Sequence, residues 1–167
     1  MPASKIKASL LALFTSATIS AYSFGNDVTA QPQLAHNAEL SVHKNPNCGC
    51  CGAWVEHVQQ QGFSATVQNH DKLNALKAEL GIPAKLQACH TSVSSDGFVF
   101  EGHIPARYIT QFLAEKPDGA RGLIVANMPI GSPGMDMGRG FQAYDVLLLL
   151  HDGSTQVYAT IKNKTEQ

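Results

Sequence analysis

The sequence predicts a mixed α/β domain in which short strands alternate with helices. Apolar residues recur with a period of two in several short segments and with a helical period in the segments between them. Glycine, proline and asparagine mark most of the boundaries between these segments. The length of 167 residues and the hydrophobic content of 44% suffice for one domain with its own core.

The first seven elements follow one another at short intervals. Asn45-Pro46-Asn47 ends the first strand, Gly62 ends the first helix, and Gly81 and Pro83 end the second. The second helix is expected to carry Leu73, Leu76 and Leu80 on one side. In chain order we predict a strand at 40–44, a helix from the cysteines at 48–51 to residue 61, a strand at 63–67, a helix at 71–80, a hairpin of strands 88–93 and 98–100, and a helix from Pro105 to Glu115.

Further elements follow this core. A strand is predicted at 122–126, and two more at 144–150 and 155–161 joined by a short turn. Between them, residues 127–142 form a loop of about 16 residues, which is longer than most connections in a domain and is therefore expected to be functional or disordered.

The N-terminal segment has the composition of a secretory signal. Lys5 and Lys7 precede an apolar run of small residues at 8–21, and Ala21-Tyr22-Ser23 offers a cleavage site. The run falls short of the roughly 20 apolar residues that a membrane span needs, which disfavours the alternative of an uncleaved anchor. The predicted organisation is a signal peptide at 1–23, a flexible leader at 24–38, the folded domain at 39–161 and a polar tail at 162–167.

Charge excludes nucleic acid as a partner. Loss of residues 1–23 removes two lysines and no acidic residue, so the formal net charge changes from −1 to −3. An acidic product with scattered charge has no basic stripe for a phosphate backbone. The later apolar run at 146–150 is short enough to be a buried strand, so no membrane span is expected after signal cleavage.

The cysteines are the most informative residues. Cys48, Cys50 and Cys51 are clustered and Cys89 is remote. An exported chain with four cysteines ordinarily suggests two disulfides. Here neighbouring cysteines in the cluster are separated by one residue or none, so a pair within it would close a very small ring, and at most one could reach Cys89.

The cluster lies where a helix begins, which suits metal capture. The positive end of the helix dipole favours thiolates, and Gly49 and Gly52 leave the sulfur atoms free to converge. The spacing fits structural zinc poorly, because zinc sites commonly use two pairs of ligands. Thiolates together with thioethers select Cu(I). We therefore expect a copper site.

Methionine and histidine supply further candidate ligands. Met128, Met135 and Met137 all lie in the loop at 127–142, although a methionine is ordinarily a core residue. Among the histidines, position favours three, whereas ordinary surface or hydrogen-bonding roles are expected for His36, His57, His70 and His151. The full set of predicted metal ligands is Cys48, Cys50, Cys51, Cys89, His90, Met135, Met137, His43, His103 and Met128.

Four motifs in order resemble a known family. They are Val42-His43-Lys44-Asn45-Pro46-Asn47-Cys48-Gly49-Cys50-Cys51, Ala88-Cys89-His90-Thr91, Glu101-Gly102-His103-Ile104-Pro105-Ala106, and Met128-Pro129-Ile130-Gly131-Ser132-Pro133-Gly134-Met135. The chain is similar over about residues 39–161 to the CopG-type periplasmic copper-resistance proteins, long catalogued as a domain of unknown function. This resemblance implies periplasmic location, copper bound by the clustered cysteines with help from the second Cys-His motif, and a role in interconverting the two copper oxidation states.

The resemblance and the element order both imply a thioredoxin-like fold, with the loop at 127–142 and the last hairpin added to it. Cys89 would then lie beside Cys48, Cys50 and Cys51 in one pocket, which could hold several copper ions. The expected partners are copper ions and periplasmic efflux or redox proteins.

Two other interpretations remain open. The first is a thiol-disulfide oxidoreductase of thioredoxin-like type. The usual redox pair has two residues between its cysteines, whereas neighbouring cysteines of this cluster have one or none, which disfavours this interpretation. The second is a small secreted domain with structural disulfides and no metal.

Overall fold

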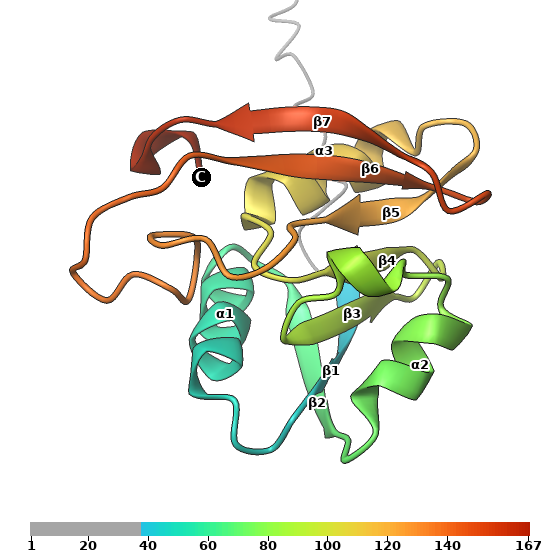
Figure 1. The fold of residues 1–167 in the computed structure, drawn as a ribbon, viewed down its shortest axis with the longest axis horizontal. Helices are drawn as coiled ribbons and strands as arrows, with labels where there is room; N and C mark the ends of the chain where they lie inside the picture. Colours follow the sequence, from blue (N-terminus) through green and yellow to red (C-terminus); the bar gives the residue numbers. More distant parts are fainter. Residues whose placement is uncertain (1–37) are drawn as a thin grey trace, which may run out of the picture. The chain divides into compact units, whose positions relative to one another are not determined.

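Residues 38–167 are described by the computed structural model, and they form a mixed α/β structure with three α-helices and one seven-stranded sheet (Figure 1). The predicted signal peptide, and the predicted leader except for Ala38, lie outside the described residues. In chain order the strands and α-helices are β1 (Glu39–Lys44), α1 (Gly49–Gln60), β2 (Ser64–Asn69), α2 (Leu73–Glu79), β3 (His90–Ser94), β4 (Val99–Glu101), α3 (Ala106–Glu115), β5 (Ala120–Ile124), β6 (Tyr144–Leu150) and β7 (Thr155–Ile161).

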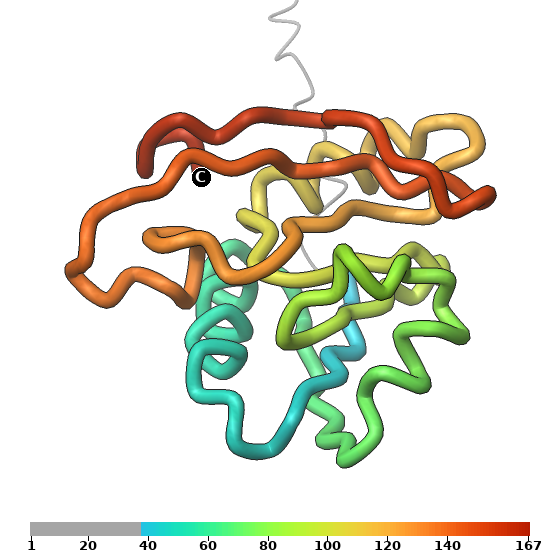
Figure 2. The backbone as a smooth tube through the Cα atoms, viewed as in Figure 1, coloured from blue at the N-terminus to red at the C-terminus, as the bar shows by residue number. Residues whose placement is uncertain are grey.

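The strand order of the sheet is β2-β1-β3-β4-β5-β6-β7. β1 pairs with β2 and β4 with β5 in parallel, and the other neighbours are antiparallel. Lys44 at the end of β1 is opposite His90 at the start of β3. The chain that leaves β1 for the clustered cysteines therefore starts beside the chain that enters β3 from Cys89, as the tube in Figure 2 allows the reader to follow.

Two hydrophobic clusters fill the space between the helices and the sheet. The larger one joins Trp54 and Val58 of α1 to Ile109 and Phe112 of α3, together with inward residues of the strands. The smaller one contains Ile82, Val99, Ile124 and Leu149, with Leu80 at the end of α2 packed against it. Helices α1 and α3 thus share one cluster, whereas the end of α2 belongs to the other.

Most predicted elements are confirmed, and the differences lie at their ends. The bounds of β6 and β7 are as predicted, and Pro105 directly precedes α3. The strand predicted at 122–126 is wrong by two residues, because β5 begins at Ala120 and ends at Ile124. The second helix is shorter than predicted, because the backbone of Lys72 has a φ of −120° and is not helical.

Helix α2 also differs from its predicted amphipathic pattern. Leu73, Leu76 and Leu80 are only half-buried, while Lys77 is fully buried. The ammonium group of Lys77 contacts the carboxylate of Glu101 on β4, which is buried as well. A buried charge is tolerated when it is paired and hydrogen-bonded, so this ion pair explains why a lysine faces the sheet.

The predicted polar tail is hydrogen-bonded to the domain. It contains a short 3₁₀-helix, Lys164–Glu166. The side-chain amide of Gln167 donates to the carbonyl of Gly131 at 2.8 Å, and the Tyr108 hydroxyl donates to the carbonyl of Glu166 at 2.9 Å. The end of the chain therefore supports the loop at 127–142. Within residues 38–167 no helix combines the length and the apolar character that a membrane crossing requires.

Candidate metal centre

The first turn of α1 presents the three clustered cysteines. Cys48 is the N-cap residue of the helix, with φ −81° and ψ 94°, and Cys50 and Cys51 lie in the first turn. The backbone amide of Cys48 donates to the carbonyl of Asn45 at 3.1 Å, so the predicted break at Asn45-Pro46-Asn47 is a tight turn that delivers the chain into the helix. Cys51 is fully buried, and Cys48 and Cys50 are half-buried.

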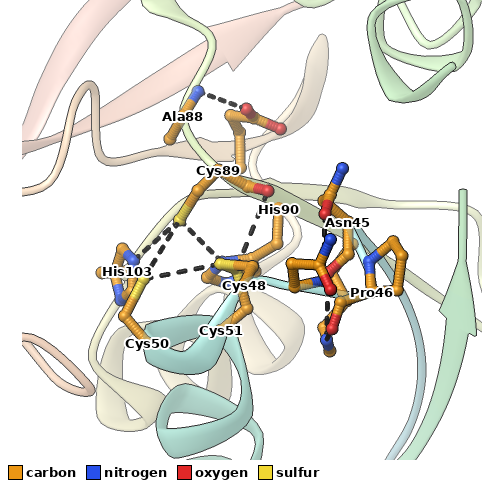
Figure 3. Close-up of a disulfide and its surroundings, with 12 residues drawn as sticks. Asn45, Pro46, Cys48, Cys50, Cys51, Ala88, Cys89, His90 and His103 are labelled. Carbon is orange, nitrogen blue, oxygen red and sulfur yellow. Dashed lines mark hydrogen bonds between the residues drawn. A yellow bond between two sulfur atoms is a disulfide. The ribbon is translucent and has the colours of Figure 1, made fainter. Parts of the chain in front are cut away.

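Cys89 approaches this cluster as predicted. Its sulfur lies 4.0 Å from the sulfur of Cys50, and the sulfur of Cys50 lies 3.5 Å from that of Cys48 (Figure 3). Ligand atoms of Cys48, Cys50, Cys51 and Cys89 all lie within 4.8 Å of one another. The antiparallel pairing of β1 with β3 causes this approach, because it places the residue before His90 next to the end of β1.

The expectation against a disulfide within the cluster is wrong. Cys48 and Cys51 are joined by a disulfide, and Cys50 and Cys89 are free thiols. The prediction considered only neighbouring cysteines, whereas Cys48 and Cys51 are separated by two residues, Gly49 and Cys50. This is the Cys-x-x-Cys spacing of redox pairs. One helical turn brings the two Cα atoms to 5.4 Å, within the usual range for a disulfide.

His103 faces the sulfur of Cys89. Its Nε2 lies 3.0 Å from that sulfur, and its Nδ1 lies 2.8 Å from the carbonyl oxygen of Pro133. A carbonyl can only accept a hydrogen bond, so Nδ1 carries the proton of the neutral ring and Nε2 keeps its lone pair. His103 is fully buried and can therefore act at Nε2 as a hydrogen-bond acceptor or as a metal ligand.

His90 lies on the other side of Cys89. Its Nδ1 is 3.6 Å from the Cys89 sulfur, and its ring packs against Trp54 and His103 with centroid distances of 4.4 and 4.9 Å. The second ring nitrogen, Nε2, is buried and has no hydrogen-bond partner among the described residues. Cys89, His90 and His103 form a second group of candidate ligands that shares Cys89 with the first.

Burial sets the electrostatics of these groups. It raises the pKa of the Cys89 thiol to about 12, with the neighbouring Cys50 acting in the same direction. Burial also lowers the pKa of His103, and it lowers the pKa of His90 well below its usual range, with further lowering from His103. The metal-free pocket therefore holds neutral imidazoles and a protonated Cys89 thiol at neutral pH. The helix-dipole argument does not reach Cys89, because this residue lies outside α1.

Two glycines let the segments around the pocket approach closely. Gly102, with φ +80°, donates its amide to the carbonyl of His90 at 3.0 Å, and a Cβ there would lie 2.3 Å from the carbonyl oxygen of Val125. Gly134, with φ +81°, lies against the first turn of α1, where a Cβ would be 2.6 Å from the carbonyl oxygen of Cys50 and 2.8 Å from the amide nitrogen of Trp54. The loop at 127–142 therefore runs beside the start of α1.

The structure places the three loop methionines differently. Met135 is half-buried and follows Gly134, the residue that touches α1. Met128 and Met137 are 48% and 65% exposed. Of the three, Met135 is the least exposed and directly follows the residue that touches the first turn of α1.

His43 is not in either ligand group. Its Nδ1 lies 2.7 Å from Nε2 of His70, which belongs to neither group. Of the histidines given ordinary roles, His57 accepts a hydrogen bond at 3.1 Å from the amide of Ala106, the first residue of α3, and His151 is exposed in the turn after β6. His36 lies outside the described residues.

The sequence analysis missed the residues that hold Cys89 in place. Lys77 donates to the carbonyl of Ala88 at 2.9 Å, and the carboxylate of Glu101 accepts from the amide of Ala88 at 2.6 Å. The hydroxyl of Thr91 also donates to Glu101. The ion pair thus binds both the backbone amide and the backbone carbonyl of Ala88, the residue that precedes Cys89. Lys77 lies within the helical stripe formed by Leu73, Leu76 and Leu80, but the sequence does not show that Glu101 is its partner.

Comparison with known proteins gives a consistent result. Residues 86–135 match a family described as a protein of unknown function, DUF411. Two solved structures, described as copper resistance protein copG in forms 1 and 2, are 38% and 37% identical to this chain. They align with TM-scores of 0.69 and 0.70 over 74% and 75% of this chain and 96% and 98% of their own. No curated protein sequence matches the chain.

Proposed function

The chain belongs to the CopG-type family of copper resistance proteins, and on this premise we propose that it binds Cu(I) in the periplasm through Cys48, Cys50, Cys51 and Cys89. The observation that carries this proposal is the convergence of four cysteine ligand atoms within 4.8 Å of one another. Copper is here the cargo that the protein holds. Each thiolate can bridge two ions, so the pocket has the donors for more than one.

The donor set favours copper over the other common metals. Thiolates and neutral imidazoles select Cu(I) and zinc, whereas calcium and magnesium require oxygen ligands. Within residues 38–167, neither ligand group includes an acidic side chain. Copper resistance in the relatives then favours copper over zinc. We propose His90 and His103 as the nitrogen ligands and Met135 as a thioether ligand, with Met137 and Met128 as the more exposed methionines of the same loop.

Redox interconversion of copper is the mechanism that this cysteine arrangement supports. When Cys48 and Cys51 are reduced, their two thiols can give two electrons to two Cu(II) ions. The products are the Cys48–Cys51 disulfide, two Cu(I) ions and two protons. An external dithiol reductant must return the disulfide to thiols before the next cycle, and this requirement assigns the protein a redox partner.

The predicted location and fold fit this proposal. A disulfide persists in an oxidising compartment such as the periplasm, which is consistent with an export signal at 1–23. We infer that β1 to α3 form a thioredoxin-like unit, supported by the sheet order β2-β1-β3-β4 and by the cysteines at the start of α1. The loop at 127–142 and strands β5 to β7 extend this unit within a domain at 39–161.

Metal analysis of protein prepared with Cu(I) under anaerobic, reducing conditions tests the proposal. We expect at least one copper per chain. The count should fall close to zero when Cys48, Cys50, Cys51 and Cys89 are all serine, because no soft ligand then remains at the pocket except Met135. A matched control changes the exposed Met137 to leucine and should keep most of the copper. Copper content that is the same with and without the cysteines would refute sulfur ligation.

A thiol-disulfide oxidoreductase is the second candidate function. The Cys48–Cys51 disulfide at the start of α1 favours it, because the spacing and the helix position are those of a redox pair. Reduction of insulin disulfides by the copper-free protein distinguishes the two functions. Turnover that is lost in Cys48→Ser and unaffected by copper would favour the oxidoreductase, whereas the copper function predicts no turnover above a free dithiol.

A further inference from the structure

Two histidines face each other outside the sulfur pocket. His43 lies on β1, and His70 directly follows β2, the parallel neighbour of β1. The amide of His70 donates to the carbonyl of Lys44 at 2.9 Å, which continues the pairing of the two strands. As a result Nδ1 of His43 and Nε2 of His70 lie 2.7 Å apart, and the ring centroids lie 4.8 Å apart.

This geometry is close to that of two ligands on one metal ion. Nitrogen ligands at about 2.0 Å from an ion, at right angles to each other, lie roughly 3 Å apart, so the rings would need to separate by only a few tenths of an ångström. Burial and the neighbouring His70 lower the pKa of His43, so this imidazole is neutral at neutral pH. One proton now lies between the two nitrogens, and an ion that takes its place needs that proton to move to the far side of one ring.

The pair is accessible and lies next to further donors. Both rings are half-exposed. His43 lines a cavity of about 420 Å³ beside α2, and His70 lines one of about 520 Å³. The wall of the second cavity also contains Asp71, Cys48 and Cys89. An ion at the histidine pair would therefore lie beside a cavity whose wall also contains two of the four cysteines.

We propose that His43 and His70 form a second metal site, which takes Cu(II) through the two imidazole nitrogens, with water at the remaining positions. Nitrogen and oxygen donors suit Cu(II) and its tetragonal geometry, whereas the thiols of the neighbouring pocket suit Cu(I). Cu(II) is also the divalent first-row ion that such a donor set binds most tightly. The protein then offers one site for each oxidation state of copper, and His70 of the second site lines the same cavity as Cys48 and Cys89.

The experiment uses a chain in which the sulfur pocket cannot interfere. Cys50→Ser and Cys89→Ser remove the free thiols, and the Cys48–Cys51 disulfide stays intact. Cu(II) sulfate is added in competition with nitrilotriacetate, and electron paramagnetic resonance with spin-echo modulation counts the imidazole nitrogens. We expect one Cu(II) per chain with two imidazole ligands. Because the free thiols are absent, this result is independent of Cu(I) binding by the cysteines.

Two near-isosteric substitutions separate a metal site from a structural hydrogen bond. His43→Asn keeps a polar atom near the position of Nδ1, and His70→Gln keeps one near Nε2. Each should weaken Cu(II) binding at least tenfold, while the matched control His151→Asn should leave it unchanged. Binding of equal strength in His43→Asn and His70→Gln, or a signal without imidazole nitrogen, would overturn the proposal.

A second measurement applies if the variants do not fold. Cu(II) is paramagnetic and broadens the proton signals of nearby residues. In the chain with Cys50→Ser and Cys89→Ser alone, a substoichiometric amount of Cu(II) should broaden the ring signals of His43 and His70 before those of His151. Simultaneous broadening of all three would contradict a specific site.

Discussion

Cys89 is the residue on which the two ligand groups meet. Its sulfur lies 4.0 Å from that of Cys50 and 3.0 Å from Nε2 of His103. Burial keeps this thiol protonated, so a metal ion that binds Cys89 would have to displace its proton. The carbonyl of Pro133 fixes the orientation of His103, as outer partners commonly do for histidine ligands.

The ion pair of Lys77 and Glu101 gives a prediction about stability. Lys77→Met leaves a buried carboxylate without its counter-charge, and removing one partner of a buried pair costs about 3–5 kcal/mol. The matched control is Lys116→Met, because Lys116 pairs with Asp96 at 2.7 Å on the surface and such pairs contribute about 1 kcal/mol or less. Urea unfolding measures both. Equal losses in the two variants would show that Glu101 is stabilised without Lys77.

The buried histidines predict how stability depends on pH. The pKa of His90 in the folded chain lies well below its usual range, whereas an unfolded histidine titrates near pH 6.5. Below about pH 6.5 the unfolded chain therefore binds a proton that the folded chain does not. Above this pH the buried histidines do not change the free energy of unfolding. As the pH falls below it, each such histidine lowers the free energy of unfolding by up to about 1.4 kcal/mol per pH unit.

Urea unfolding of the copper-free protein at pH 7.5 and pH 5 tests this dependence. The change between the two pH values should be smaller in His90→Leu than in the parent chain, because leucine has no proton to bind. His151→Leu, at an exposed position, should keep the full change. The same pH dependence in His90→Leu as in the parent would mean that other groups cause it.

At the scale of elements, the loop at 127–142 and the start of α1 form one packed unit. Gly134 touches the backbone of the first helical turn, and Pro133 binds His103. The chain end adds to this unit through Gln167, which binds Gly131. The loop thus forms one side of the cysteine pocket, which is consistent with the functional role that its length predicts.

A pair of glycine substitutions tests whether this contact matters. Gly134 and Gly138 have φ values of +81° and +70°, so alanine causes similar backbone strain at both. Only at Gly134 would the new Cβ meet other atoms. We expect Gly134→Ala to reduce the free energy of unfolding by about 1–3 kcal/mol more than Gly138→Ala, and to weaken Cu(I) binding. Chelator competition measures the latter. Identical behaviour of the two variants would show that the loop lies free of α1.

The periodicity of apolar residues predicted the strands and helices. It did not predict where Lys77 and His43 lie, because polar contacts in the folded chain determine their positions. Strands β6 and β7 have a clear alternation and strong turn residues, so their bounds could be read directly. Lys77 could not be recognised as buried, because its burial depends on Glu101, which is 24 positions away and pairs with it only in the folded chain. His43 was assigned to the sulfur site, yet the parallel pairing of β1 and β2 brings it to His70.

For the cysteines, the sequence alone contains most of the information needed to predict the pocket. Cys89 approaches the cysteine cluster because β3 pairs with β1. The resemblance carried by the four motifs implied a fold with this pairing. The Cys48–Cys51 disulfide required only a count of the residues between non-neighbouring cysteines. This disulfide matters for the whole molecule, because the pocket can offer four thiolates only after two electrons have reduced the Cys48–Cys51 disulfide.

The last prediction follows from this electron count. Fully reduced protein mixed with excess Cu(II) under anaerobic conditions should convert about two Cu(II) ions to Cu(I) for each Cys48–Cys51 disulfide formed, because each thiol supplies one electron. A Cu(I)-specific chelator measures the reduced copper, and thiol titration should fall from four groups per chain to two. The variant with Cys48→Ser and Cys51→Ser keeps Cys50 and Cys89 and should reduce far less copper at early times. If that variant reduced copper as fast as the parent, the electrons would come from Cys50 and Cys89, and the disulfide at the start of α1 would have no part in copper chemistry.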